Sequence, residues 1–186
     1  MSGADVKQQI IISGVGGQGI LFVTRLLAET AIQKGMPVLT SETHGMAQRG
    51  GVVISHFKAG GFASPLVRPG KADLLLLLKG ENLAIHRHFL KPGGTVIMNA
   101  REVPADRGEL EVLAVDADGL ALKLGNPQVV NLILLGFALT ARGRERLFCA
   151  GHDVVEVIKR KLAEKGKLLA ASLRALEAGM GEGNEG

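Results

Sequence analysis

The chain has 186 residues, of which 46% are hydrophobic, and such a length and composition suit one domain with a substantial core. Its formal net charge is +4, its basic residues are scattered and it contains no Trp or Tyr, so we expect no nucleic-acid partner. The single cysteine, Cys149, excludes an internal disulfide and also an iron–sulfur cluster held by this chain alone, which needs about four thiolates.

The apolar segments are too short for a membrane protein. Residues 1–9 are polar and carry no apolar signal-peptide core. The apolar runs 74–78 and 129–141 fall short of the ~20 residues that span a bilayer. We therefore expect a cytoplasmic protein that does not contact a membrane.

A glycine-rich turn follows the first predicted strand. Residues 8–13 are predicted as a strand around the apolar run 10–12, as in a strand that is buried on both faces, and a helical pattern of apolar residues begins at Ile20. Between them, Gly14, Gly16 and Gly19 have the G-x-G-x-x-G spacing that binds dinucleotides when it joins a strand to a helix. Such a turn lets a ligand or another backbone approach closely, and the helix N-terminus favours an anion there. The spacing alone does not decide between these uses, because many α/β proteins turn through glycines without binding a nucleotide.

The remaining patterns predict a mixed sheet. Residues 37–41 form the second strand, residues 52–58 alternate as a third, and residues 62–67 return as its antiparallel partner after a turn at Gly60-Gly61. Further strands are expected at 72–78, 95–99 and 111–115, a turn at 92–94, and helices at 81–89, 120–124, 129–141, 153–163 and 167–178. The fold class is therefore α/β: a three-layer α/β/α, Rossmann-like domain whose mainly parallel sheet includes an antiparallel hairpin. We expect one domain over residues 1–178 and a disordered tail over 179–186.

Glu42 supports an alternative function. It lies 23 residues after Gly19, near the ~20 at which dinucleotide-binding folds place a ribose-binding acid, which favours an NAD-binding oxidoreductase. Against this, no residue arrangement for hydride transfer is present, and the polar loop after Glu42 is unusual for such a fold. A non-catalytic binding module is a third hypothesis, which an exposed face on the 129–141 helix would favour.

The loop after the second strand carries oriented polar groups. His44 and Arg49 lie where the strand leaves the carboxyl edge of the sheet, and open α/β sheets bind ligands at that edge. Arg49 could hold a carboxylate or phosphate through two hydrogen bonds. Alternatively, both side chains brace the loop or a subunit interface.

The other histidines and the cysteine suggest no metal site. His86 and His88 are two apart on a predicted helix and point to different faces, which makes them surface residues and a poor ligand pair. His56 is placed on an edge strand, and Cys149 is a small buried residue at a helix end.

Two motifs taken together resemble a known family. Gly16-Gly17-Gln18-Gly19 and Gln48-Arg49-Gly50-Gly51 are similar to the GGQG turn and the RGG element of the small, gamma-type subunit of 2-oxoacid:ferredoxin oxidoreductases. The longer string over 41–51 most resembles the beta subunit of the indolepyruvate ferredoxin oxidoreductases. Ala72-Asp73, Glu81, Pro92-Gly93-Gly94 and Asn99 also fit, and the similarity covers roughly residues 8 to 140.

This resemblance implies a division of labour between subunits. A large alpha subunit would hold thiamine diphosphate, Mg and iron–sulfur clusters, decarboxylate the 2-oxoacid, pass electrons to ferredoxin and form an acyl-CoA with CoA as cosubstrate. The present chain would hold no cofactor and no catalytic residue, in line with its single cysteine and its lack of a thiamine-diphosphate motif. Its partner-facing or cofactor-binding residues would be Gly14, Gly16, Gly17, Gln18, Gly19, Glu42, His44, Gln48, Arg49, Gly50 and Gly51.

Overall fold

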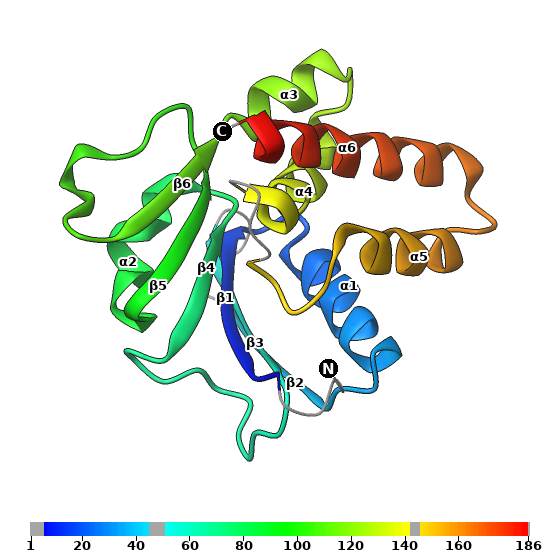
Figure 1. Ribbon diagram of the computed structural model, residues 1–186. Coiled ribbons are helices and arrows are strands. Elements are labelled where there is room, and N and C mark those ends of the chain that lie inside the picture. Colours follow the sequence, from blue (N-terminus) through cyan, green and yellow to red (C-terminus); the bar gives the residue numbers. More distant parts are fainter. Residues whose placement is uncertain (1–5, 45–50, 142–145, 186) are drawn as a thin grey trace.

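A six-stranded mixed sheet forms the centre of the protein (Figure 1). A computed structural model describes residues 6–44, 51–141 and 146–185. The strands are β1 (Gln8–Val15), β2 (Val38–His44), β3 (Val52–Ala59), β4 (Ala72–Leu77), β5 (Leu90–Asn99) and β6 (Glu111–Val115). Their order is β2-β3-β1-β4-β5-β6, in which β1, β4, β5 and β6 pair in parallel and β3 is antiparallel to both of its neighbours. The predicted α/β class with a mixed, mainly parallel sheet is confirmed.

Helices lie on both faces of the sheet, but unequally. They are α1 (Ile20–Gln33), α2 (Leu83–His86), α3 (Ala117–Lys123), α4 (Val130–Thr140), α5 (Gly151–Lys161) and α6 (Gly166–Glu185), with short 3-10 turns at Gly80–Asn82, Arg87–Phe89, Ala105–Arg107 and Pro127–Val129. Alternate strand residues such as Ile10 and Ile12 pack against α1, α3, α4, α5 and α6. Ile11, from the same strand, packs on the opposite face with Val67 and Leu83, where α2 is the one α-helix of the described residues (Figure 1). No helix of the described residues is long and apolar enough to cross a membrane.

The antiparallel part of the sheet differs from the prediction. Residues 62–67 form no strand; β3 instead pairs with β2 on one side and β1 on the other. The reason is that both edges of β3 are already used, and Val67 is buried over the second face of the sheet, where its N–H donates to Nδ1 of His56 at 3.2 Å. The segment therefore covers the sheet instead of extending it.

Two further local predictions are corrected. The turn expected at 92–94 is an irregular part of β5, because Leu90 pairs with Ala72 and Thr95 with Leu74, and Gly93 absorbs the extra length at φ +74°. The helix expected at 81–89 is divided into a 3-10 turn, the short α2 and a second 3-10 turn.

The expected tail at 179–186 is wrong for the residues that the structure describes, because α6 continues to Glu185. The glycines of α6 allow this helix to pack closely against α4. A Cβ on Gly179 would overlap the carbonyl oxygen of Ile133 in α4, and one on Gly183 would overlap Oγ1 of Thr140. That hydroxyl also donates to the carbonyl of Met180 at 2.9 Å. The close approach of two helix backbones outweighs the ~1 kcal/mol that each glycine costs a helix.

This contact predicts opposite effects for two glycine substitutions on α6. Gly179→Ala should lower the free energy of unfolding by about 2 kcal/mol or more, because the new methyl group meets backbone that cannot move aside cheaply. Gly181→Ala, with nothing within 4 Å of its Cβ, should raise it by about 0.5–1 kcal/mol. Urea denaturation followed by circular dichroism measures both, and equal effects would show that the helices do not depend on this contact.

Candidate functional site

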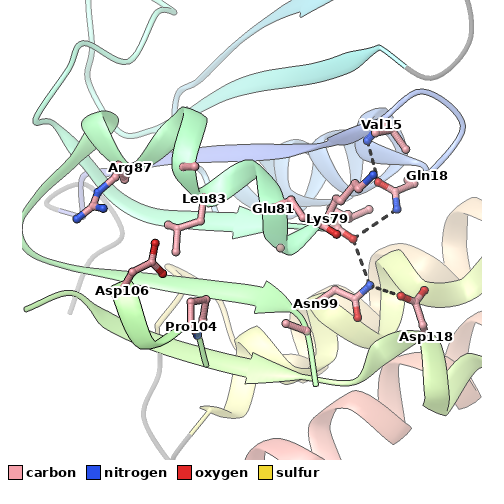
Figure 2. Close-up of a pocket in the computed structure, with 14 residues that line it drawn as sticks. Val15, Gln18, Lys79, Glu81, Leu83, Arg87, Asn99, Pro104, Asp106 and Asp118 are labelled. Atoms are coloured by element: carbon pink, nitrogen blue, oxygen red, sulfur yellow. Dashed lines mark hydrogen bonds between the residues drawn. The ribbon is translucent and has the colours of Figure 1, made fainter. Parts of the chain in front are cut away.

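A cavity of about 660 Å³ opens at the carboxyl ends of β1, β4 and β5 (Figure 2). It is lined by Val15, Gln18, Leu78, Lys79, Gly80, Glu81, Leu83, Ala84, Arg87, Asn99, Ala100, Pro104, Asp106 and Asp118. The chain runs from β1 through α1 to β2 on one side of the sheet, while β4 pairs with β1 on the other side. The cavity therefore lies at the switch point of the topology, where open α/β sheets bind ligands.

The glycine turn borders this cavity, and the side chain of Gln18 occupies the space inside the turn itself. Helix α1 begins at Ile20 as predicted, after Gly17 at φ +94° and Gly19 at φ +77°. The Oε1 atom of Gln18 accepts a hydrogen bond from the N–H of Val15 at 2.8 Å, and a Cβ on Gly14 would lie 2.5 Å from the same oxygen. The carboxamide of Gln18 thus occupies the concave side of the turn, where a dinucleotide-binding fold would admit a phosphate.

The predicted site residues are partly brought together. The N–H of Gly16 donates to the carbonyl of Gly51 at 3.2 Å, so the start of β3 touches the glycine turn. His44 ends β2 opposite Val53 of β3, at the same edge of the sheet. Gln48, Arg49 and Gly50 lie outside the described residues, and the role of all these residues stays a prediction.

Glu42 lies in the wrong place for a dinucleotide. It is an exposed residue of β2, opposite Ser55 of β3, and β3 separates it from β1. Two strand spacings of about 4.8 Å put β2 roughly 10 Å from β1, whereas a ribose-binding acid works from the neighbouring strand. Together with the filled turn, this geometry argues against the NAD-binding alternative.

A hydrogen-bond network joins the strand ends beneath the cavity. The Nδ2 atom of Asn99 donates to the carbonyl of Leu78 at 3.2 Å and to Oδ2 of Asp118 at 2.9 Å, while its Oδ1 accepts from the N–H of Ala117 at 3.0 Å. The Nε2 atom of Gln18 reaches the same Leu78 carbonyl at 3.4 Å, and the two dashed lines meet there in Figure 2. The network fixes the ends of β4, β5 and α3 relative to the glycine turn.

A second asparagine completes the floor. Asn82 is buried and donates from Nδ2 to Oγ of Ser13 at 3.0 Å and to the carbonyl of Gly14 at 3.4 Å. Sequence reasoning had named Asn99 only through the family resemblance and had given Asn82 and Asp118 no role. A usable signal existed, since these polar residues lie just beyond the carboxyl ends of apolar strands.

The cavity carries charges of both signs. Lys79 and Arg87 are exposed cations, and Glu81, Asp106 and Asp118 are exposed acids. Figure 2 shows Arg87 and Asp106 at one end and Asn99 and Asp118 at the other. Its described lining combines apolar side chains with a few polar and charged groups, as binding sites for small molecules do.

Two of the three histidine predictions are wrong, those for His86 and His56, whereas His88 is exposed as predicted. His86 is not a surface residue: it is 5% exposed, and no hydrogen-bond partner of its Nε2 lies among the described residues. Burial, and then the charges of His88 and His56, lower its pKa. His56 is buried too and lies on an inner strand, not on an edge strand. The described residues contain no group of three or more His, Cys, Asp or Glu that could hold a metal ion.

The strand order, the glycine turn and the cavity together define a Rossmann-like α/β domain with a binding surface at its carboxyl edge. The family described as "Pyruvate ferredoxin/flavodoxin oxidoreductase" matches residues 9–182, and the chain belongs to this family.

Relatives of similar length support this membership. The chain is 34% identical to "Indolepyruvate oxidoreductase subunit IorB" of Pyrococcus horikoshii, over 94% of this chain and 95% of that one. It is 30% identical to the protein of the same name from Archaeoglobus fulgidus, over 97% and 98%. Among solved structures, the gamma subunit of a keto/oxoacid ferredoxin oxidoreductase from Geobacter sulfurreducens has the same fold, with a TM-score of 0.76 at 22% identity over 96% of this chain and 99% of that one.

The geometry of the turn predicts that the chain binds no nicotinamide cofactor. Calorimetric titration with NAD and with NADP should give no saturable heat, because Gln18 occupies the turn and Glu42 is two strands away. A dissociation constant in the low micromolar range would contradict the prediction, since it requires about −8 kcal/mol of specific contacts.

Proposed function

We propose that the chain is the small subunit of a 2-oxoacid:ferredoxin oxidoreductase of the indolepyruvate or arylpyruvate type. It would support, within the complex, the oxidative decarboxylation of the 2-oxoacid to an acyl-CoA. Its family membership and its full-length similarity to indolepyruvate oxidoreductase subunits support this function. A cytoplasmic location belongs to the same proposal.

The cofactors belong, in this proposal, to a large partner subunit. Thiamine diphosphate, Mg and iron–sulfur clusters would be held there, ferredoxin would receive the electrons from the complex, and CoA would be the cosubstrate. Two features of this chain support the assignment: it has one cysteine, which is buried, and its described residues contain no metal-binding cluster.

The hydrogen bond between Gly16 and Gly51 is the observation on which the partner-facing surface rests. It joins the glycine turn to the first residue after the 45–50 loop, at the edge where the parallel strands end. Gly16 and Gly17 are exposed, so another backbone can come close to them. We infer that the glycine turn and residues 42–51, which include the end of β2, together face the large subunit near its active site.

A purely structural binding module is less well supported. An exposed apolar face on the 129–141 helix would have favoured it, but residues 130–139 of α4 are all buried. That helix packs within the protein, chiefly against α6, and offers no free apolar face to a partner.

The proposal predicts that activity needs both subunits. The purified chain should be colourless and should not turn over any 2-oxoacid, because its single cysteine cannot hold an iron–sulfur cluster and its sequence carries no thiamine-diphosphate motif. Co-production with a large subunit should yield indolepyruvate-dependent and CoA-dependent reduction of ferredoxin or a viologen dye. Turnover by this chain alone with NAD would instead support a dehydrogenase.

Arg49 provides the sharpest test of the surface. Arg49→Ala should leave the melting temperature of the isolated chain almost unchanged but weaken assembly or turnover, by about 2 kcal/mol or more if the guanidinium is buried and paired in the complex. Arg160→Ala, on the exposed side of α5, is the matched control. Wild-type assembly and turnover by the Arg49 variant would show that the loop is a scaffold only.

A further inference from the structure

A group of cations surrounds one aromatic ring at the amino edge of the sheet, opposite the glycine turn. The Nζ atom of Lys58 lies 5.0 Å from the ring centroid of Phe62, and the Nζ atom of Lys7 lies 5.9 Å from the same centroid. Lys58 belongs to β3 and is 6% exposed. Phe62 begins the β3–β4 loop, at the bottom of Figure 1. Two ammonium groups thus share one ring, and the stem of one of them, Lys58, is largely buried.

Among residues 6–44, 51–141 and 146–185, these cations have no ion-pair partner. The sequence contains no Asp or Glu from 43 to 72, a stretch of 30 residues that includes Lys58, Arg68 and Lys71. Among the described residues, neither Lys7, Lys58 nor Arg68 makes an ion pair. Burial, and then the charge of Arg68, lower the pKa of Lys58. The described part of the protein therefore keeps several cations close together, an arrangement that an incoming anion would relieve.

Asp73, the acid that lines the neighbouring hollow, is already in an ion pair. A hollow of about 480 Å³ beside Phe62 is lined by Lys7, Gln9, Phe62, Gly70, Lys71, Asp73, Lys91 and Pro92. Asp73 forms an ion pair with Lys91 at 2.5 Å and accepts the N–H of Gln9 at 2.6 Å. Its charge is thus used locally, and no other acid among the described residues lines the hollow.

We propose that Lys7, Lys58, Phe62, Arg68 and Lys71, here called the basic face, form a docking surface for carboxylates of an acidic partner protein. Positive surfaces recognise complementary negative ones and steer their approach. The face also has the mixed character of a protein interface, because Leu66 in the same loop is 49% exposed. It lies at the opposite edge from the 42–51 loop, so both surfaces can be occupied at once.

The geometry favours a protein over other anions. Exposed lysines border the hollow, so it cannot enclose most of a small ligand as binding sites for small molecules do. Two ammonium groups lie by the ring of Phe62, which leaves it a poor platform for stacking a nucleic-acid base.

The test uses the full chain and a fluorescein-labelled decapeptide of Asp and Glu, with the corresponding Asn and Gln peptide as a neutral probe. Fluorescence anisotropy at low salt should show binding of the acidic peptide alone, and the affinity should fall steeply as salt is added. Lys7→Glu/Arg68→Glu should weaken binding at least about tenfold, because two of the contacts become repulsive. Lys58→Met, which keeps the side-chain length, should also weaken it.

The control is Lys165→Glu/Lys167→Glu, at exposed positions near the start of α6. Each double variant lowers the formal net charge from +4 to 0, since each reversal removes two charges. The control should bind the peptide like the wild type, and circular dichroism should show that all variants fold. Equal losses in both double variants, no binding at low salt, or displacement of the peptide by equimolar inorganic pyrophosphate would each overturn the proposal.

Discussion

The position of β3 governs both the fold and the site. An antiparallel strand lies between β1 and β2, two strands that a simple dinucleotide-binding fold would place side by side. Because β3 is antiparallel to β1, its start lies beside the end of β1, and the carbonyl of Gly51 can accept a hydrogen bond from Gly16. The same insertion moves Glu42 away from the glycine turn. One strand thus joins the two family motifs and removes the geometry that a ribose would need.

The glycine turn shows how one spacing serves different chemistry. In a nucleotide-binding turn the glycines clear space for a phosphate, whereas here Gly14 clears space for the side chain of Gln18 and Gly19 for that of Asn131. Gln18 and Asn99 then share the carbonyl of Leu78, which ties the turn to β4 and β5. The turn becomes a stiff, low surface, and such a surface suits contact with another backbone better than capture of a mobile anion.

Local signals in the sequence predicted the elements that local forces determine. The start of α1 at Ile20 and the strand Glu111–Val115 follow from residues close in sequence. The errors involve distant partners. Gly179 looks like a helix breaker until Ile133 of α4 is placed against it, and nothing near His86 in sequence reveals its burial. Asn82 acquires its role only when β1 lies beside it.

The two edges of the sheet differ in how their charges are balanced. At the carboxyl edge, cations and acids alternate around the cavity and the polar groups beneath it bond to one another. At the amino edge, the cations near Phe62 face no free acid among the described residues. A net charge of +4 spread evenly over the surface would not orient an approaching partner. Cations that are concentrated on one face produce a local positive potential, which does. The net charge of the chain is small, but its cations are unevenly distributed. In the proposed docking, the position of the basic face, not the net charge, sets which partners approach and from which side.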